Sequence, residues 1–400
     1  MKSIPLSLEQ SIKLLKPPFY IIDIPALESA LNSARQLASG LGIQYAYSYK
    51  TNYLRPICHY LNSQGVYAEV VSPFEVDITA QYGISPERVI YNGPVKDETS
   101  IAYVLSGGGL VNADSLDDLK LILRIADYID TPDLRVGLRV SFPIPGVASS
   151  RFGIDAFSED IHQAIEWLQK APTIRLTCLH CHFPNRDARS FFLRLEQVVK
   201  VLDQLKVDFE IIDIGGGLPS ELSPFVAAQL GIEEVDYGLF HQEIEAGVKQ
   251  LRKRSSAILL MEPGTMLAAN TVHLLASIRS IKTNQARTYY TLDVSRTNIG
   301  GLKQSIAFSH VVLDRQQTTA ADPDQVFVGF TCVEGDTLGN PNYHSLELGD
   351  LVLFSSVGSY SAVFKSPFIN GDLPVYTWDG NNLKASRRQQ TAADVLICDL

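Results

Sequence analysis

Residues 209–217 read FEIIDIGGG, a short apolar run that ends in three consecutive glycines. Seven further apolar runs recur before residue 265, each ending in polar residues or glycine: IQYAYSYK (43–50), VYAEVVS (66–72), RVIYNG (88–93), GLVNADS (109–115), LRVGLRVS (134–141), RLTCLHCHF (175–183) and AILLMEPG (257–264). Runs rich in Val, Ile, Leu and Tyr are typical of strands buried on both faces. We therefore expect eight buried strands.

The segments between these runs have the pattern of helices. Ser72, Pro73 and Glu75, for example, combine an N-cap serine, proline at the first helical position and glutamate at the third, which is a capping box. Eight strand–helix units over about 220 residues match the size of a (β/α)₈ barrel. The alternative is an open doubly wound sheet, but the first strand is not followed by GxGxxG.

From about residue 271 the pattern changes to alternating apolar and polar runs separated by turn residues, such as TVHLLASIRSI, ARTYYTLDVS and DLVLFSSVGSYSAVF. We expect an α/β protein in two domains. Residues 26–270 would form a TIM barrel, and residues 1–25 with 271–400 a β-rich, sandwich-like or barrel-like domain. The run FYIID (19–23) could join that second domain as a strand.

The composition excludes several classes of partner. The chain of 400 residues has a formal net charge of −10, whereas nucleic acid and anionic membranes require a basic surface. No apolar run reaches membrane-spanning length, and Glu9, Lys13 and Lys16 interrupt the N-terminal segment. Five scattered cysteines predict no disulfide framework. We therefore expect a cytoplasmic protein with no nucleic-acid or membrane partner.

The candidate functional residues lie at the carboxyl ends of the expected strands, where a TIM barrel carries its active site. Read from the eight runs, these are Lys50, Glu69, Ser72, Asn92, Asp114, Arg139, His180, His182, Gly215, Gly216, Gly217, Glu262 and Gly264. A lysine closing a buried strand would lose hydration, which predicts a lowered pKa and a nucleophilic amine. Successive backbone N–H groups in a triple glycine predict an anion nest suited to phosphate.

Glu262 would be a nearly buried carboxylate and so needs a partner, for which a protonated pyridine nitrogen or Arg139 is suitable. Cys178, His180 and His182 alternate along one strand and would share a face. A His-x-His pair could also bind zinc, as in barrel hydrolases. The remaining histidines do not fall at strand ends, so we expect no metal.

Seven motifs in order resemble one family: YSYKTN, GLRVS followed by SSRFGI, HCHF, DIGGGLP, EPG, CVEGD and GSYS. The chain resembles the fold-type III pyridoxal-phosphate enzymes, which combine an alanine-racemase-like barrel with a β domain. Within them it is similar to the diaminopimelate, ornithine and carboxynorspermidine decarboxylases. The resemblance implies pyridoxal 5′-phosphate as cofactor and a homodimer whose β domains complete the partner's active sites.

The resemblance also implies residue roles. Lys50 would hold the cofactor as a Schiff base, Glu262 would pair with the ring nitrogen, and Arg139 would be the buried partner of Glu262. Glu69 would lie near the lysine, and His182 would stack on the ring. The phosphate and its surroundings would be bound by Gly215, Gly216, Gly217, Asn185, Gly264, Thr265 and Tyr360. The substrate would meet Cys332, Glu334, Asp336 and Tyr360, with all but the tyrosine carried by CVEGD.

Three positions depart from the family pattern. Thr265 stands where an arginine usually touches the phosphate, and Pro184-Asn185 replaces the usual Gly-Ser. Val333 follows Cys332 where the diaminopimelate and ornithine enzymes have an acidic residue, and Glu334, one position later, would face the other side of a strand. The sequence therefore predicts a carboxynorspermidine-like or specialised-metabolite substrate rather than free diaminopimelate or ornithine.

The resemblance implies removal of the α-carboxylate, with Cys332 as the proton donor to Cα. A racemase of the same fold is an alternative, but racemases place an arginine at the position of Glu262. A pyridoxal-phosphate homeostasis protein without turnover is another, but such proteins lack the β domain that carries Cys332. We therefore expect a decarboxylase.

Overall fold

The computed structural model describes residues 4–221, 235–300, 308–318, 322–364 and 367–398. The chain divides into two compact units. One comprises the described residues of 32–219 and 236–264, and the other those of 1–31, 220–235 and 265–400.

The first unit is built around eight parallel strands that close into a barrel in the order β5-β4-β3-β2-β10-β9-β8-β6, with β6 paired to β5. All eight apolar runs form these strands, which confirms the predicted TIM barrel. Their bounds are β2 (Ile43–Ser48), β3 (Tyr67–Val70), β4 (Val89–Tyr91), β5 (Leu110–Ala113), β6 (Leu134–Ser141), β8 (Ile174–His180), β9 (Ile211–Asp213) and β10 (Ile258–Met261). A two-residue strand, β7 (Ile154–Asp155), extends from β6.

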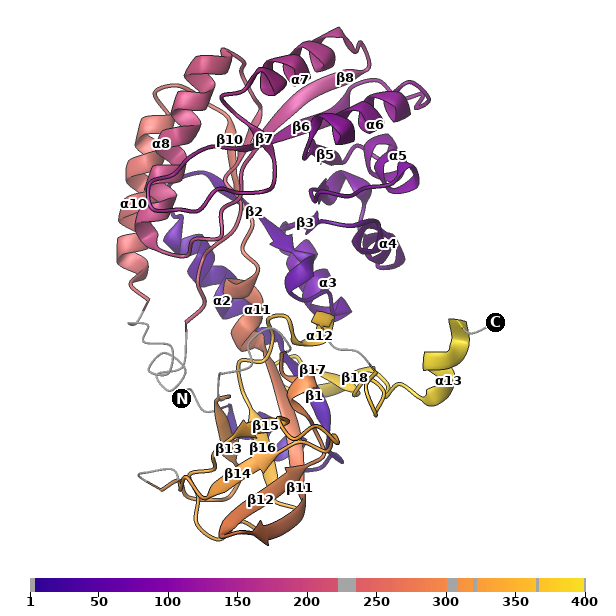
Figure 1. The fold of residues 1–400 in the computed structure, drawn as a ribbon, viewed down its shortest axis with the longest axis vertical. Coiled ribbons are helices and arrows are strands. Elements are labelled where there is room, and N and C mark those ends of the chain that lie inside the picture. The colour runs from indigo at the N-terminus through magenta and orange to yellow at the C-terminus, as the bar shows by residue number, and fades with distance from the viewer. Residues whose placement is uncertain (1–3, 222–234, 301–307, 319–321, 365–366, 399–400) are drawn as a thin grey trace. The chain divides into compact units, whose positions relative to one another are not determined.

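Helices surround the barrel strands (Figure 1). They are α2 (Ile24–Leu37), α3 (Arg55–Ser63), α4 (Pro73–Gln81), α5 (Glu98–Ser106), α6 (Leu116–Ala126), α7 (Glu159–Lys170), α8 (Ala188–Leu205) and α10 (Tyr237–Leu251). The cap of α4 differs slightly from the prediction. Ser72 Oγ accepts from Glu75 N–H as expected, but the Glu75 carboxylate accepts from Val71 N–H, one residue before the cap.

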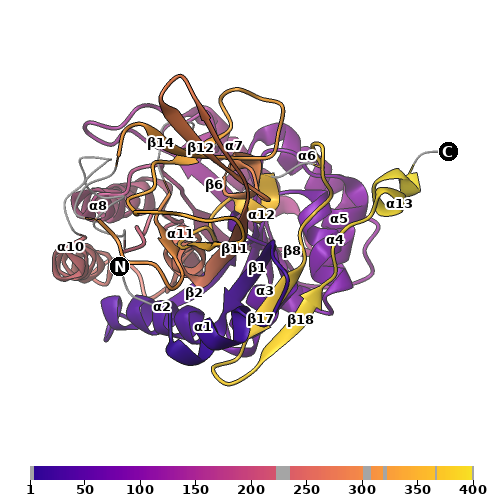
Figure 2. The ribbon, with the colours of Figure 1, turned by 90° about the horizontal axis from the view of Figure 1, so that it is seen from below.

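The second unit is rich in strands, as predicted. They are β1 (Phe19–Asp23), β11 (Val272–Asn284), β12 (Arg287–Leu292), β13 (His310–Val312), β14 (Gln325–Val328), β15 (Thr337–Gly339), β16 (Leu351–Phe354), β17 (Val375–Trp378) and β18 (Leu383–Arg387). The run FYIID is β1, antiparallel to β11 and parallel to β17, and Figure 2 shows it beside β17 and β18. Short helices accompany this sheet: α1 (Leu6–Ile12), α11 (Thr265–Ala268), α12 (Ser361–Phe364) and α13 (Ala392–Val395).

Each unit has its own apolar core. Barrel side chains from several strands meet in one cluster, which consists of Ala46, Ile90, Leu110, Cys178, Ile211 and Leu260. In the strand-rich unit α1 packs on the sheet through Leu8 and Ile12, which meet Phe19 and the wholly buried Trp378. In the described part of the chain, every helix is too short or too polar to cross a bilayer.

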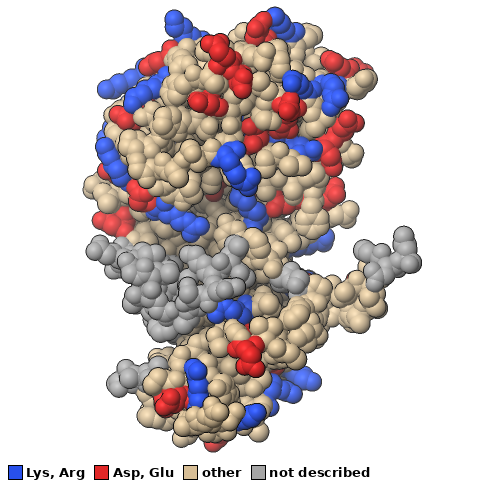
Figure 3. Space-filling view, viewed as in Figure 1, with Lys and Arg blue, Asp and Glu red and all other residues tan. Residues whose placement is uncertain are grey.

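The face drawn in Figure 3 carries acidic and basic side chains interspersed over the barrel unit, with no basic patch gathered on it. The expectation of no nucleic-acid partner stays a prediction.

Candidate active site

The sequence predicted that Lys50 ends its strand, but β2 ends at Ser48 and Lys50 lies two residues beyond it. It is in a single 3₁₀ turn (Tyr49–Thr51) directly after β2. Its Nζ is 2.7 Å from Oε2 of Glu69 on the neighbouring strand β3, and Glu69 is buried. Ser48, which pairs in register with Glu69, donates its hydroxyl to the same oxygen. Strand pairing thus places a buried carboxylate beside the predicted amine.

The predicted lowering of the Lys50 pKa is wrong for this structure. Burial alone would lower it, but Glu69 and Glu262 outweigh burial and raise the pKa of Lys50 above its ordinary value. The side chain remains 37% exposed, so the amine is accessible. In the ligand-free chain Lys50 is therefore an ammonium group held by a carboxylate, and it must lose a proton before it can act as a nucleophile.

Glu262 follows β10 and is buried with defined hydrogen-bond partners. Asn92, at the end of β4, donates from Nδ2 to Glu262 Oε1 at 2.6 Å and to Glu69 Oε1 at 3.2 Å. Asn112 on β5 in turn donates to Asn92 Oδ1 at 2.8 Å. This chain of amides joins four strands of the barrel and fixes both carboxylates.

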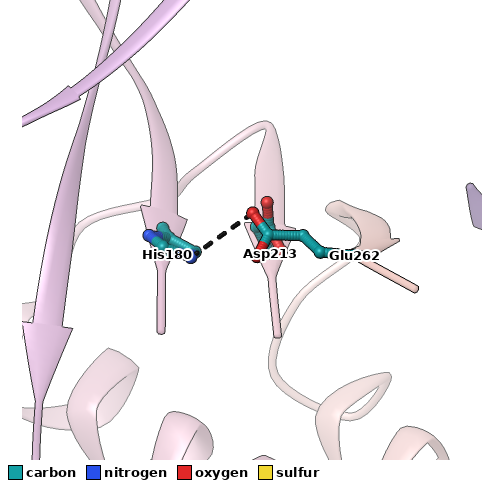
Figure 4. A group of neighbouring side chains, drawn as sticks. All are labelled: His180, Asp213 and Glu262. Atoms are coloured by element: carbon teal, nitrogen blue, oxygen red, sulfur yellow. Dashed lines mark ion pairs between the residues drawn. The ribbon is translucent and has the colours of Figure 1, made fainter. Parts of the chain in front are cut away.

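Two further groups surround Glu262, as Figure 4 shows. His180 Nε2 lies 3.5 Å from Glu262 Oε1, and Asp213 is next to His180 in the strand register. Burial would raise the pKa of Glu262, but its interactions with His180 and Lys50 hold it below its usual value. Burial and the neighbouring Glu262 instead raise the pKa of Asp213 well above its usual range. Of these two carboxyls, Glu262 is the one that ionises more readily.

The ligand atoms of His180, Asp213 and Glu262 lie within 4.8 Å of one another, near enough for one metal ion. The pair that the sequence suggested for zinc is a different one, His180 with His182. Two oxygens of the observed group already accept hydrogen bonds, Glu262 Oε1 from Asn92 and Asp213 Oδ1 from Gly215 N–H. The expectation of no metal stays a prediction.

His182 lies two residues beyond β8 and is oriented by the glycine loop. Its Nδ1 accepts the N–H of Gly216 at 3.1 Å, so the ring proton resides on Nε2. Burial, together with the positive charges of Lys50 and Arg194, holds the pKa of His182 below its ordinary value. The imidazole is therefore neutral at neutral pH, which suits a ring that stacks on a cofactor.

The loop Gly215–Gly217 excludes side chains. Gly215 has a φ of +69°, and a Cβ placed on it would lie 2.5 Å from the carbonyl oxygen of Cys181. Gly217 has a φ of +113°, and its Cβ would lie 2.8 Å from the carbonyl oxygen of Asn185. The predicted nest of three N–H groups is only partly formed. The N–H groups of Gly215 and Gly216 bond to Asp213 and His182, which leaves that of Gly217 without a partner among the described residues.

Arg139 is near the site but does not pair with Glu262, so that predicted pairing is wrong. Its Nη1 lies 2.8 Å from Oδ1 of Asp114, which follows the adjacent strand β5, and its guanidinium covers the ring of Phe152 at 4.6 Å. The hydrogen bond to Glu262 that was expected from Arg139 is donated by Asn92. The sequence could not decide between these carboxylates because both follow barrel strands.

Gly264 follows directly after Glu262 and Pro263, and a Cβ on it would collide with Thr51 in the turn that carries Lys50. Thr265, its neighbour in sequence, starts the short helix α11 and is half-buried. The backbone after β10 therefore passes close to the turn of the candidate lysine.

The remaining candidates belong to the strand-rich unit. Cys332 and Glu334 are exposed, and Tyr360 is half-buried with a φ of +63°. The segment that carries Cys332 is a turn between β14 and β15, so strand alternation does not set the direction of the Glu334 side chain. Asp336 is buried and accepts hydrogen bonds from Arg296 N–H at 2.8 Å and from the Thr331 hydroxyl at 2.5 Å. Its carboxylate therefore fixes this turn.

Sequence reasoning missed Ser48, Asn112, Asp213 and Arg194. The first three lie on barrel strands, each two residues before a predicted site residue, so the alternation of side chains along a strand could have found them. Arg194 lies in the middle of α8, where a sequence pattern predicts only an amphipathic helix.

The family model described as "Pyridoxal-dependent decarboxylase, pyridoxal binding domain" matches residues 26–269. The chain belongs to this decarboxylase family. The diaminopimelate decarboxylase of Zymomonas mobilis is 25% identical over 370 residues, which cover 88% of this chain and 84% of that protein.

Two solved structures have a similar fold. The diaminopimelate decarboxylase of M. jannaschii has a TM-score of 0.86 at 19% identity, covering 97% of this chain and 93% of that one. The lysine/ornithine decarboxylase of Vibrio vulnificus, in complex with cadaverine, has a TM-score of 0.77 at 19% identity, covering 93% and 97%. The family membership, together with these relatives, makes this chain a pyridoxal-phosphate-dependent amino-acid decarboxylase.

The site fits pyridoxal phosphate chemically. Lys50 offers an accessible amine for the aldehyde, Glu262 an ionised carboxylate for a protonated ring nitrogen, and His182 a neutral imidazole. The glycine loop keeps space free of side chains and leaves the N–H of Gly217 outside its own hydrogen bonds. These are the kinds of group that the ring, the aldehyde and the phosphate each require.

Proposed function

We propose that this decarboxylase acts on an amino acid or amino-acid conjugate other than free diaminopimelate or ornithine. The observation that carries the proposal is Val333. An apolar side chain, 52% exposed, follows Cys332 at the position where the resemblance places the acidic group that receives a distal amine. Another carboxylate of the turn, Asp336, is already held by hydrogen bonds from neighbouring backbone N–H groups.

Diaminopimelate is the second candidate substrate. The two relatives described above that are named for that activity cover 88% and 97% of this chain. Glu334 also lies beside Val333 in an exposed turn. A turn does not fix the direction of a side chain as a strand does, so Glu334 could receive a distal amine.

The roles proposed for individual residues combine the family resemblance with the contacts of the site. Bound pyridoxal phosphate supplies the electron sink that accepts the bonding electrons as carbon dioxide leaves. Lys50 binds the cofactor, and Glu69 holds that amine at 2.7 Å and can accept its proton. Ionised Glu262 favours a protonated ring nitrogen, which strengthens the electron sink and favours decarboxylation over racemisation. Cys332 donates the proton to Cα through its thiol.

We propose a homodimer in which Cys332 and Asp336 of one subunit complete the site of the partner subunit, with residues 26–270 forming the cofactor-binding domain. Cys332, Val333 and Glu334 are exposed in the single chain, as residues that face a second subunit would be. A shared site also explains why the residues of the motif CVEGD, apart from the buried Asp336, are exposed in the single chain.

The substrate is tested by measuring carbon dioxide release from a panel of diaminopimelate, ornithine, lysine, carboxynorspermidine and conjugated amino acids. The proposal expects turnover of a member other than diaminopimelate and ornithine, and preferred turnover of diaminopimelate would refute it. Val333→Glu is the matched variant and should improve the use of substrates with a distal amine. Loss of the cofactor absorbance in Lys50→Ala, with no adduct after borohydride, reads the role of Lys50 independently of substrate.

The shared site is tested by mixing two impaired variants, Lys50→Ala and Cys332→Ala, and measuring formation of the normal product above the level of either variant alone. Random exchange of subunits puts half of the protein in mixed dimers, each with one intact site, so activity should return to about a quarter of the wild-type value. No recovery after confirmed subunit exchange would show that each site is built from one chain. Cys332→Ala alone should keep the cofactor but slow the product or divert it to aldehyde, and unchanged product would refute the donor role.

A further inference from the structure

Arg194 on α8 is a buried cation without a counter-charge. Its side chain is wholly buried, and its Nη1 donates to the carbonyl oxygens of Ile214 and Gly216, the latter at 2.9 Å. Its Nε and Nη2 have no hydrogen-bond partner, and no ion pair joins it to any acidic residue in the described ranges. Its guanidinium is packed against the rings of Phe191 at 4.6 Å and Phe183 at 5.6 Å.

A buried guanidinium without an anion is costly, because its charge has lost its hydration and gained only two carbonyl dipoles and the faces of two aromatic rings. Burial lowers the pKa of Arg194, yet a guanidinium stays protonated in proteins. An arrangement of this kind becomes favourable once an anion comes within range. The unpartnered Nη2 lies 3.7 Å from the point where a Cβ of Gly217 would stand, directly under the loop.

The glycine loop by itself is poorly equipped to hold a phosphate. The N–H groups of Gly215 and Gly216 already donate hydrogen bonds within the site. Only the N–H of Gly217, which has no partner among the described residues, can donate to a phosphate. Thr265 provides a hydroxyl but no charge at the position after Glu-Pro-Gly. The phosphate of the cofactor carries nearly two negative charges at neutral pH and needs a cation near it.

We propose that Arg194 is the positioning residue that supplies this positive charge from beneath the loop. It holds the carbonyl oxygens of Ile214 and Gly216 inward, so that the N–H of Gly217 faces the phosphate. Its guanidinium balances the phosphate charge across a single layer of backbone, where low-dielectric surroundings weaken the attraction little. The charge that the family pattern provides after Glu-Pro-Gly is thus provided here from α8.

The test compares two ligands that differ only in the phosphate. Apo full-length chain is titrated with pyridoxal phosphate and with pyridoxal, and the affinity of each is read from the visible absorbance of the Lys50 adduct. Arg194→Met should weaken binding of pyridoxal phosphate about 30-fold while changing that of pyridoxal less than about threefold. Arg194→Lys, which keeps the charge, should restore most of the phosphate-dependent difference. Equal losses for both ligands would mean that Arg194 only supports the fold of the loop.

A second variant keeps the proposal testable if Arg194→Met does not fold. Thr265→Arg adds a cation at the position after Glu-Pro-Gly. If Arg194 already balances the phosphate, this change should tighten pyridoxal phosphate less than about threefold in the wild-type background. When Thr265→Arg is combined with Arg194→Lys or Arg194→Met, it should restore the lost preference for pyridoxal phosphate over pyridoxal. A large gain of phosphate-dependent affinity in the wild-type background would overturn the proposal, because it would show that the charge is missing.

Discussion

The substitution Gly215→Ala tests whether the glycine loop is required for steric reasons. An alanine at a φ of +69° costs about 1–2 kcal/mol in backbone strain. Its Cβ would also stand 2.5 Å from the carbonyl oxygen of Cys181 and 2.9 Å from Cα of His182. Both are backbone atoms, and the N–H of Cys181 is fixed to the carbonyl of Asp213 at 2.8 Å, so they cannot simply rotate away.

The loop must therefore shift, which adds about 1–3 kcal/mol for overpacking. We expect Gly215→Ala to lower the free energy of unfolding by about 2–5 kcal/mol in total. The shift would also weaken the hydrogen bond between the N–H of Gly216 and Nδ1 of His182. The affinity for pyridoxal phosphate should fall with it.

The measurement is urea unfolding of the apo chain, followed by tryptophan fluorescence and circular dichroism. Gly65→Ala is the matched control, because Gly65 has a φ of +80° and nothing lies within 4 Å of the position of its Cβ. The control should show the backbone strain alone, about 1–2 kcal/mol. An equal loss in Gly215→Ala and Gly65→Ala would refute the steric explanation, since it would show that the loop accommodates a methyl group.

Three further predictions concern single groups. Burial and the nearby Glu69 raise the pKa of Glu75 to about 7 from its ordinary 4.5, so stability present below pH 4.5 is lost as the pH rises through 7. Glu75→Gln should remove up to about 3 kcal/mol of that loss. The measurement is the free energy of unfolding in urea at pH 5 minus that at pH 8. The same pH difference in Glu75→Gln and in the wild type would contradict the prediction. The ring resonances of His182 should stay constant in NMR spectra from pH 5 to 8, because its pKa is lowered, and a titration near 6.5 would disprove the neutral assignment. Asp336→Ala should cost about 1–3 kcal/mol by leaving buried donors unpaired, whereas exposed Glu334→Ala should change stability by less than about 0.5 kcal/mol; similar losses would argue against the turn-fixing role.

Local sequence patterns predicted some of the site residues but not others. Lys50, Glu69 and Glu262 were found because each lies at the end of an apolar run, and the carboxyl ends of parallel strands meet at one end of a barrel. The same rule did not give Arg194, because its helical position has no relation to a strand end. It also could not choose the partner of Arg139, since several carboxylates end neighbouring strands.

Contiguous residues were enough to predict the eight barrel strands, to suggest that FYIID joins the second sheet and to nominate the reactive groups, because hydrophobic periodicity and strand ends are local properties. How those groups behave depends on the packing of distant segments. The pKa of Lys50 rises because β3 and β10 flank β2 and bring Glu69 and Glu262 to its amine. The charge of Arg194 comes to lie beneath Gly217 because α8 packs behind the glycine loop. Electrostatic interactions depend on distance in space and on burial, which no local stretch of sequence contains.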